Sequence, residues 1–478
     1  MAQESLIFTL SGIRGIFGKQ LNFEFAKTLA IAFGLWLDHT DKRVIIGRDT
    51  RPSGEVLEKA ILEGLAATDY EVINTSVSPT PLIIHAKNIH NIPAGIIITG
   101  SHNSEEWNGL KLLGQHNYLQ NDEITQIRQI ISSVNPKKYT VSNFKLKQKI
   151  SSLNPLSEYL NSLNRLINFD EIHQENNLRV VIDTGAGAGK LATPYILKSL
   201  GCEVKTINNE LLVKNKFPRR IEPIPANLTD LIMEVWQGKC DIGFAHDSDA
   251  DRLAIVGDDG TCYSEDTSLA LIMQYLLQNK DYDSEVTFVT NIASSLMFEV
   301  IADKFNAKLI RTPIGELYLV NTINQILKDS KESLTKSLTF GGEGSCGGVI
   351  FPIFNNTRDG IFASVKIIEI LVKTGEKISK LVSKLPKYYS HRENVNIKGL
   401  NIQTLITKVK ADLVAEGEEV NQIGNDIRFG KDKEWFILIH PSNTEPILRV
   451  ISEAKSDSLS RLYCETTTEL IKLIINSD

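Results

Sequence analysis

Three segments of the chain repeat one hydrophobic pattern, in which an apolar run of strand-forming residues leads through a short turn into a helical period. The pattern predicts strands followed by helices at Arg43–Asp49 and Ser53–Ala67, at Arg179–Asp183 and Leu191–Leu200, and at Val286–Thr290 and Ser295–Phe305. Apolar runs of this kind are typical of parallel or mixed sheets that helices cover on both faces. The pattern therefore favours several related α/β units.

The first of these helices has the clearest period. We expect Ser53 to be its N-cap, because a serine hydroxyl accepts hydrogen bonds well from the first turn of a helix. Its apolar side chains recur at helical spacing and are expected to form one face, comprising Val56, Leu57, Ala60, Ile61 and Leu65.

The last hundred residues follow another pattern and predict a smaller α+β domain. Runs at Asp426–Phe429 and Glu434–His440 flank a Gly-Lys-Asp-Lys turn and predict a hairpin, followed by a strand at Ile447–Ser452 and a helix at Ser458–Ile474. Polar, lysine-bearing stretches at Pro136–Ser152 and Ser379–Glu393 are expected to mark the boundaries of the first and last domains.

Length and composition narrow the class of protein. The 478 residues predict about three domains and allow four, at roughly 150 residues per domain. A formal net charge of −6 argues against binding to nucleic acid through an overall basic field. We expect no membrane span, because no apolar run approaches the roughly 20 residues required, and no signal peptide. The five cysteines lack CxxC spacing, which predicts a reduced, cytoplasmic protein without disulfides or a zinc site.

The strongest chemical signal is the segment Asp247-Ser-Asp249-Ala-Asp251-Arg252, directly after an apolar run. Carboxylates at alternate positions of a loop can converge on one hard cation, and Arg252 beside them favours Mg²⁺ that handles phosphate. An EF-hand loop is excluded, because its sixth and twelfth positions hold Arg252 and Asp258 in place of Gly and Glu. The alternative interpretation is a solvated acidic loop.

A second apolar strand, Ile96–Ile98, leads into Thr99-Gly-Ser101-His102-Asn103. Ser101 is a candidate nucleophile, although the GxSxG elbow of hydrolases is absent. The alternative is a Ser/Asn-rich turn that only ends a strand.

Two further loops carry groups suited to hydroxylated or anionic ligands. In Gly341–Gly348, glycines let the backbone approach a polyhydroxylated ligand while Glu343 accepts hydrogen bonds. In His440–Pro446, with Arg449 just beyond, hydroxyls, an amide and a guanidinium are the donors that a phosphate dianion needs. A glycine hairpin and a loose turn are the respective alternatives.

Gly187 and Gly189 fit a loose dinucleotide-binding pattern, with Glu210 at a suitable distance. The P-loop pattern fails, since Thr184 replaces its first Gly and Leu191 its Ser/Thr. We prefer a tight strand-to-helix turn here, and keep a dinucleotide-dependent oxidoreductase as an alternative.

Taken in order, these segments resemble the α-D-phosphohexomutase superfamily of phosphoglucomutases, phosphomannomutases and phosphoglucosamine mutases. The resemblance covers essentially the whole chain and lies in Ser11–Gly15, Gly47–Gly54, a phosphoserine loop at Thr99–Asn103, a metal loop at Asp247–Arg252, a sugar loop at Glu343–Ser345 and a phosphate loop at Ser442–Glu445. It implies three related α/β domains with mixed sheets and a smaller C-terminal α+β domain around a central cleft. The expected domains are 1–150, 151–257, 258–378 and 379–478, and each carries one of the last four loops.

The resemblance implies an enzyme that moves a phosphoryl group between the 6- and 1-positions of a hexose, through a phosphoserine and a bisphosphorylated sugar. Ser101 would carry the phosphoryl group, and Mg²⁺ would bind to it together with Asp247, Asp249 and Asp251. A hexose 1,6-bisphosphate would act as activator. A small-molecule hexose phosphate is the expected partner, and the enzyme is expected to be a monomer or a homodimer.

The resemblance also implies roles for the surrounding residues. Lys111 or His102 would transfer the proton at the reacting hydroxyl, and Arg14 and Arg252 would stabilise phosphoryl charge. Together with Arg48 and Arg449 these cations would form a local basic field inside an acidic protein. Substrate contacts are expected from Glu343, Ser345, His440, Ser442, Asn443, Thr444 and Arg449.

Departures from the family pattern bear on the substrate. The sugar loop reads Glu-Gly-Ser-Cys-Gly-Gly and is closer to the form found in the phosphoglucosamine mutase-like branch, with one residue extra. His440 stands where the family usually has Arg, which would weaken the grip on a dianion. The resemblance favours conversion of glucosamine 6-phosphate to glucosamine 1-phosphate. Phosphomannomutase or phosphoglucomutase activity is the near alternative, and a noncatalytic sugar-phosphate-binding protein is the more distant one.

Overall fold

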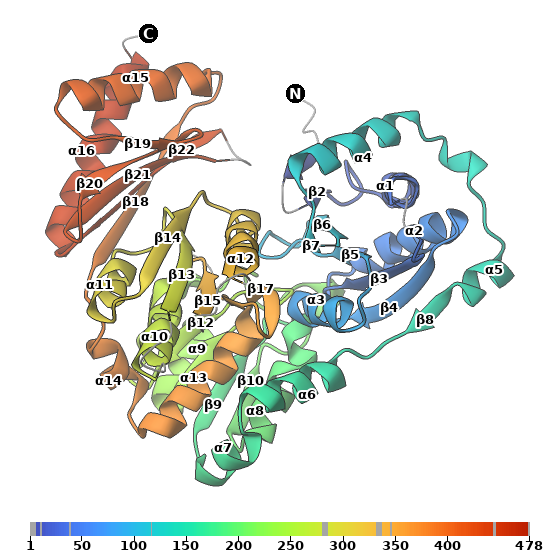
Figure 1. Ribbon diagram of the computed structural model, residues 1–478, viewed down its shortest axis with the longest axis horizontal. Helices are drawn as coiled ribbons and strands as arrows, with labels where there is room; N and C mark the ends of the chain where they lie inside the picture. Colours follow the sequence, from blue (N-terminus) through green and yellow to red (C-terminus); the bar gives the residue numbers. More distant parts are fainter. Residues whose placement is uncertain are drawn as a thin grey trace.

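The computed structural model describes residues 6–9, 12–37, 40–115, 117–279, 285–330, 337–344, 347–442 and 446–476. Four sheets follow one another along the chain, and each is covered by helices of its own region (Figure 1). Three of the sheets are mixed and the fourth is antiparallel, which confirms the predicted fold of three related α/β units and a smaller α+β unit.

The first sheet has the order β1-β2-β6-β5-β3-β4-β8, with β7 paired to β6. Its strands are β1 Ile7–Thr9, β2 Gly12–Ile16, β3 Arg43–Arg48, β4 Glu71–Val77, β5 Ala94–Ile98, β6 Trp107–Gly114, β7 Asn117–Tyr118 and β8 Ile150–Ser152. Its helices are α1 Phe23–Trp36, α2 Ser53–Ala67, α3 Thr80–Ile89, α4 Asn121–Ser133 and α5 Asn143–Gln148.

Helix α2 has the predicted bounds but not the predicted cap. Pro52 is its N-cap and no side chain caps the helix, because Ser53 already lies in the first turn. Val56 is 41% exposed, whereas Leu57, Ala60, Ile61 and Leu65 are buried. The inner face of the helix is therefore narrower than the sequence indicates.

The second sheet has the order β10-β9-β11-β12, in which only β12 runs antiparallel. Its strands are β9 Arg179–Asp183, β10 Glu203–Ile207, β11 Ile242–Ala245 and β12 Ala254–Gly257, and its helices are α6 Leu156–Leu166, α7 Phe169–Glu175, α8 Thr193–Ser199 and α9 Thr229–Gly238. The helix predicted at Leu191–Leu200 is α8, Thr193–Ser199, which has a proline in its first turn and follows a 3₁₀ turn at Ala188–Leu191.

The third sheet has the order β14-β13-β15-β16-β17. Its strands are β13 Glu285–Asn291, β14 Lys308–Thr312, β15 Ser337–Gly342, β16 Val349–Phe351 and β17 Asn355–Asp359. Helices α10 Glu265–Gln278, α11 Met297–Lys304, α12 Glu316–Ser330, α13 Gly360–Thr374 and α14 Ile378–Ser383 surround it. One hydrophobic core runs through the second and third units, since Phe244 of β11 and Phe288 of β13 belong to the same buried cluster.

The fourth sheet has the order β18-β22-β21-β20-β19. It contains the predicted hairpin, β20 Asp426–Lys431 and β21 Trp435–Pro441, and the predicted strand and helix, β22 Ile447–Ala454 and α16 Asp457–Asn476. The sequence did not predict β18 Tyr389–Asn396, β19 Asn421–Ile423 or α15 Ile402–Ala415. A small apolar cluster joins this sheet to the third unit through Leu296, Phe436 and Leu438.

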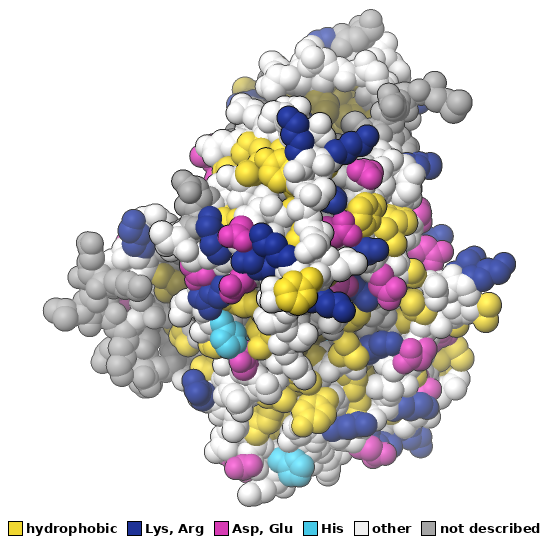
Figure 2. Space-filling view, turned by 90° about the vertical axis from the view of Figure 1, so that its right-hand side faces the viewer, with side chains coloured by type: hydrophobic (Ala, Val, Ile, Leu, Met, Phe, Trp, Pro, Cys, Tyr) yellow, Lys and Arg dark blue, Asp and Glu magenta, His cyan; other side chains and the backbone are white. Residues whose placement is uncertain are grey.

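The charged side chains on the surface and the cysteines can be compared with what the composition predicts. Lys and Arg side chains are interspersed with Asp and Glu on the face shown in Figure 2 and do not gather in one basic area. Within the described ranges, no helix is long and apolar enough to cross a membrane. The four cysteines that the structure describes, Cys202, Cys240, Cys262 and Cys464, are free thiols.

Candidate active site

The turn after β5 presents Ser101. Strand β5 is buried throughout and ends at Ile98, so the next residues emerge at the carboxyl edge of the first sheet. Ser101 is buried and has a positive φ of 47°, which is rare for a residue with a side chain and marks a constrained turn. Its backbone N–H donates to Thr99 Oγ1 at 2.8 Å. The turn therefore holds the serine in one orientation.

Arg51 holds this turn in place through hydrogen bonds to its backbone carbonyls. The side chain is fully buried, and its Nη2 donates to the carbonyl oxygens of Ser101 at 2.8 Å and Asn103 at 2.6 Å. Its Nε donates to Asp49 Oδ2 at 3.1 Å, and the same oxygen accepts from Thr99 Oγ1 at 2.7 Å. Arg51 and Asp49 thus organise the loop that carries Ser101, a role that the sequence did not predict for them.

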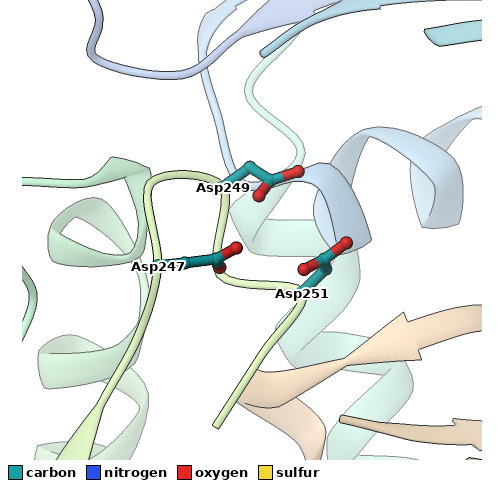
Figure 3. A group of neighbouring side chains, drawn as sticks. All are labelled: Asp247, Asp249 and Asp251. Atoms are coloured by element: carbon teal, nitrogen blue, oxygen red, sulfur yellow. The ribbon is translucent and has the colours of Figure 1, made fainter. Parts of the chain in front are cut away.

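Asp247, Asp249 and Asp251 lie in the loop between β11 and β12, and their carboxylates converge on one space (Figure 3). All three are buried, and one carboxylate oxygen of each lies within 4.8 Å of the others. The Oδ1 atom of each has no hydrogen-bond partner among the described residues. Because buried oxygens without partners are costly, three such carboxylates gathered around one space fit a hard divalent cation.

The serine and the acidic loop are in direct contact. Ser101 Oγ donates to Asp247 Oδ2 at 2.9 Å. Ser248, between the first two aspartates, donates to the carbonyl of Ser101 at 2.7 Å and to Asp49 Oδ2 at 2.8 Å. Residues almost 150 positions apart in the sequence are thereby held in one hydrogen-bonded unit.

Buried cations balance the acidic loop. Lys111 Nζ on β6 donates to Asp249 Oδ2 at 2.8 Å and to Asp251 Oδ2 at 3.3 Å. Burial alone would lower the pKa of Lys111, but the charges of Asp249 and Asp251 outweigh burial and raise it, so the side chain is an ammonium. Burial, followed by the charges of Asp249 and Asp251, raises the pKa of Asp247 well above its usual value.

His102 is neutral and is oriented by an arginine. Arg252 Nη2 donates to His102 Nδ1 at 2.8 Å, and Ser101 Oγ lies 3.4 Å from the same nitrogen. The charge of Arg252, together with burial, lowers the pKa of His102 far below its usual value. Arg14 of β2 donates to Asn103 Oδ1 at 2.7 Å. Both predicted arginines thus lie beside the serine loop.

Arg48, in contrast, does not face the site. Its Nε donates to Glu58 Oε2 at 2.7 Å, and its Nη2 lies 3.3 Å from Glu55 Oε1. Both glutamates belong to α2 of the same unit. The expectation that Arg48 contributes to the basic field of the site is therefore wrong, because its charge is taken up by helix α2.

Arg358 connects the acidic loop to the sugar loop. Its Nη2 donates to Asp251 Oδ2 at 2.7 Å and its Nη1 to Glu343 Oε2 at 2.5 Å. The other oxygen of Glu343 accepts from Asn291 Nδ2 at 3.1 Å and from the backbone N–H of Gly315 at 3.0 Å. The sequence did not predict this role of Arg358, because its contact with Asp251 joins residues that are 107 positions apart.

The phosphate loop of the fourth unit forms a second group of predicted residues. His440 of β21 and Arg449 of β22 are cross-strand neighbours, and the Ser442 backbone N–H donates to the carbonyl of Ile447 at 2.9 Å. His440 Nδ1 lies 2.7 Å from Asp426 Oδ1, a carboxylate partner that the sequence did not predict. Three predicted ligands lie outside the described residues: Ser345, Asn443 and Thr444.

Gly187 and Gly189 are explained by packing. A Cβ at Gly187 would lie 2.7 Å from the carbonyl oxygen of Asp247. A Cβ at Gly189 would lie 3.1 Å from the side chain of Ala250. Both glycines therefore allow the turn after β9 to pack against the acidic loop, which supports the structural interpretation over a dinucleotide site.

Three sequence profiles match the first three units in order. They describe domains I, II and III of phosphoglucomutase/phosphomannomutase and match residues 5–138, 157–260 and 264–389. A Thermococcus kodakarensis protein named "phosphoglucomutase/phosphomannomutase" is 33% identical over 472 residues, which are 98% of each chain. A Pyrococcus abyssi protein named "probable phosphoglucosamine mutase" is 31% identical, with 97% of each chain covered.

A solved structure shares the whole arrangement. The Burkholderia thailandensis phosphoglucomutase/phosphomannomutase family protein superposes with a TM-score of 0.80 at 24% sequence identity, covering 99% of this chain and 98% of that one. The fold, the three matched domains and the full-length relatives agree with one another. The chain belongs to the phosphoglucomutase/phosphomannomutase family of the α-D-phosphohexomutase superfamily.

Proposed function

We propose that this phosphohexomutase interconverts glucosamine 6-phosphate and glucosamine 1-phosphate through a phosphoserine at Ser101 and a bisphosphorylated sugar. The proposal rests on the hydrogen bond of 2.9 Å from Ser101 Oγ to Asp247, which belongs to a loop with three carboxylate oxygens that have no hydrogen-bond partner among the described residues. A nucleophilic hydroxyl next to a set of hard oxygen ligands is the arrangement that metal-assisted phosphoryl transfer requires.

Asp247, Asp249 and Asp251 would hold Mg²⁺ together with the oxygen on Ser101. Bound there, Mg²⁺ neutralises charge on the transferring phosphoryl group. Arg252 and Arg14 flank the serine loop and supply fixed positive charge where phosphoryl oxygens gather.

The bond from Ser101 Oγ to phosphorus breaks as a sugar hydroxyl oxygen binds the same phosphorus, and the product is a hexose bisphosphate. The sugar hydroxyl proton would pass to His102, which is neutral here, or to Lys111, which would first have to give up one of its ammonium protons. Replacement by Lys111→Arg and by His102→Gln separates these two assignments through the pH profile of kcat, since only loss of the true base removes the limb of the profile that the base produces. The bisphosphate then returns its other phosphoryl group to Ser101, so an added hexose 1,6-bisphosphate would activate unphosphorylated enzyme.

Recognition of the sugar is divided between two units. Glu343, and Ser345 beside it, would accept and donate hydrogen bonds at hydroxyls that both binding poses share. His440, Ser442, Asn443, Thr444 and Arg449 would hold the phosphate that is not reacting. The pair of His440 and Asp426 supplies a single imidazole in place of a guanidinium fork, so this loop relies on Arg449 for bidentate contact.

The choice of glucosamine rests on the form of the sugar loop and on the relatives named as phosphoglucosamine mutases. The relative named phosphoglucomutase/phosphomannomutase supports the alternative of glucose or mannose phosphates. A panel of glucosamine, glucose and mannose 6-phosphates, each with Mg²⁺ and its bisphosphate, decides between them. The highest kcat/KM is expected for glucosamine phosphate, and a higher value for either other sugar would transfer the assignment to that sugar.

The phosphoserine itself is tested by mass spectrometry after incubation with a hexose 1,6-bisphosphate. The wild-type protein is expected to gain one phosphoryl group on Ser101, and Ser101→Ala is expected to gain none and to lose turnover while remaining folded. Ser104→Ala is a matched control, because Ser104 lies in the same loop and, among the described residues, its hydroxyl donates to Glu106 alone. A protein that binds hexose phosphate without being phosphorylated would instead be a noncatalytic binding protein.

A further inference from the structure

A cavity of about 540 Å³ lies where the fourth sheet meets the third unit. Leu296 and Glu299, at the start of α11, form one wall, and residues 419–421, 428–432 and 435–436 of the fourth unit form the other. The volume falls within the range of about 300–1,000 Å³ that is usual for small-molecule sites. The cavity uses none of the residues assigned to phosphoryl transfer.

Arg428 points into this region from β20. It is opposite Asn421 on β19 and Leu438 on β21, so it lies on the face of the sheet that meets the third unit. The guanidinium lies 4.4 Å from the ring centre of Phe436, which supports it from one side. The side chain is therefore held in a fixed direction.

One edge of the Arg428 guanidinium lacks hydrogen-bond partners among the described residues. Nε and Nη2 of Arg428 are both buried, and neither has a partner among the residues that the structure describes. These two atoms form the edge of a guanidinium that binds a carboxylate or phosphate through two parallel hydrogen bonds. A buried charged edge without partners is costly unless a ligand completes it.

Nearby carboxylates do not complete this edge. Glu299 accepts two hydrogen bonds from Arg311, at 2.7 and 2.8 Å. Glu453 accepts from the backbone N–H of Leu296 at 2.6 Å. Asp432 has a side chain that is 77% exposed. Among the described residues, therefore, no carboxylate oxygen accepts a hydrogen bond from Nε or Nη2, and the edge is open to a ligand.

We propose that this cavity is a second binding site, in which Arg428 takes a small metabolite by its phosphate or carboxylate group. Asn421 and the exposed Lys431 lie within reach of the rest of such a ligand, because both line the same cavity. Burial lowers the pKa of Arg428 to about 10, so the guanidinium remains charged at neutral pH and attracts an anion.

A ligand in this cavity would affect the position of the fourth unit relative to the third, because the walls of the cavity belong to both units. A ligand that contacts both walls binds better to one relative position of the fourth unit than to others and shifts the population towards it. The fourth unit carries the phosphate loop, so an anion in this cavity would change the KM for hexose phosphate more than kcat. The cavity is thus a candidate regulatory site.

Calorimetric titration of the full chain with inorganic phosphate, and separately with citrate, tests the proposal. Arg428→Gln is expected to bind one oxyanion fewer per chain than the wild-type protein, and Arg428→Lys to bind about tenfold more weakly, because lysine keeps the charge without the fork. Arg449→Gln is the matched control and is expected to lose a different site while keeping this one. The tighter of the two probes identifies the phosphate or carboxylate class.

Thermal unfolding provides a second measurement of oxyanion binding in case Arg428→Gln does not fold correctly. Without ligand, Arg428→Met is expected to be at least as stable as the wild-type protein, because it removes two buried N–H groups, Nε and Nη2, that have no partner among the described residues. Phosphate or citrate should raise the melting temperature less in this variant than in the wild-type protein. Equal oxyanion binding by wild-type and Arg428→Gln proteins would overturn the proposal, as would the absence of any binding that depends on Arg428.

Discussion

Arg358 provides the sharpest test of how the metal loop and the sugar loop work together. It donates to Asp251 at 2.7 Å and to Glu343 at 2.5 Å, and both carboxylates are buried. The change Arg358→Met keeps a long apolar side chain but removes both hydrogen bonds. Asp251 then keeps Lys111 as a partner, while Glu343 keeps Asn291 and the backbone of Gly315.

The size of the effect follows from these contacts. Hydrogen bonds to charged groups contribute about 1.5–3 kcal/mol each, so the two bonds together amount to about 3–6 kcal/mol. If the lower end of this range appears in transition-state stabilisation, kcat/KM falls on the order of 100-fold. Arg358→Lys, which can reach one carboxylate but not both, is expected to lie between wild type and Arg358→Met.

Steady-state kinetics with hexose phosphate, at several Mg²⁺ concentrations, measures this directly. We expect both the KM for sugar phosphate and the Mg²⁺ concentration for half-maximal activity to rise, because one arginine serves both loops. Arg461→Met is the control, since Arg461 is an exposed arginine of α16. Activity of Arg358→Met within threefold of wild type, at unchanged Mg²⁺ dependence, would refute the coupling.

Three other predictions follow from the same geometry. Arg51→Lys is expected to reduce turnover at least tenfold, because a lysine cannot serve the carbonyls of Ser101 and Asn103 together with Asp49, whereas Arg48→Lys should leave turnover unchanged. Chelation of divalent cations should abolish turnover reversibly, and Asp249→Asn should raise the Mg²⁺ concentration needed for half-maximal activity. Turnover that persists after chelation, or an unchanged Mg²⁺ requirement in Asp249→Asn, would contradict the assigned site. Burial raises the pKa of Asp359 from 3.8 to about 6, so its contribution to stability is present below pH 3.8 and is lost as the pH rises through 6. This amounts to about 3 kcal/mol at most. The melting temperature of the wild-type protein should therefore fall relative to that of Asp359→Asn between pH 4 and pH 6.5, and parallel pH profiles would contradict the buried, proton-retaining carboxyl.

The sequence predicts the parts of the fold that hydrophobic periodicity determines. Strand β9 and helix α2 have the predicted bounds, because apolar runs and helical stripes are local properties. Strand β18, Tyr389–Asn396, begins within the polar stretch Ser379–Glu393, which the sequence predicted as a domain boundary, and continues three residues beyond it. It is an edge strand of the fourth sheet, where polar side chains are favoured because one side faces solvent.

The residues of the candidate site likewise fall into those that the local sequence predicts and those that it does not. The acidic loop and the serine turn were visible because their residues are adjacent in the sequence. Arg51 and Arg358 were not, since each meets its partners only after folding: Arg51 lies 50 positions from Ser101, and Arg358 lies 107 positions from Asp251. An arginine gives no local signal of the carboxylate that it will find, so its role requires the tertiary structure.

The contacts of the acidic loop explain how one site can be rigid at the metal and permissive at the sugar. Asp249 accepts from Thr80 Oγ1 of α3 at 2.7 Å and from Lys111, both in the first unit, while Asp251 accepts from Arg358 of the third. The loop of the second unit is therefore clamped between its two neighbours, and its carboxylates need little rearrangement to bind a cation. The fourth unit is joined to the third by a much smaller apolar cluster. The proposed turnover of a bisphosphate would need a fixed phosphoryl site and a less tightly held contact at its other end, and this division of contacts is consistent with that proposal.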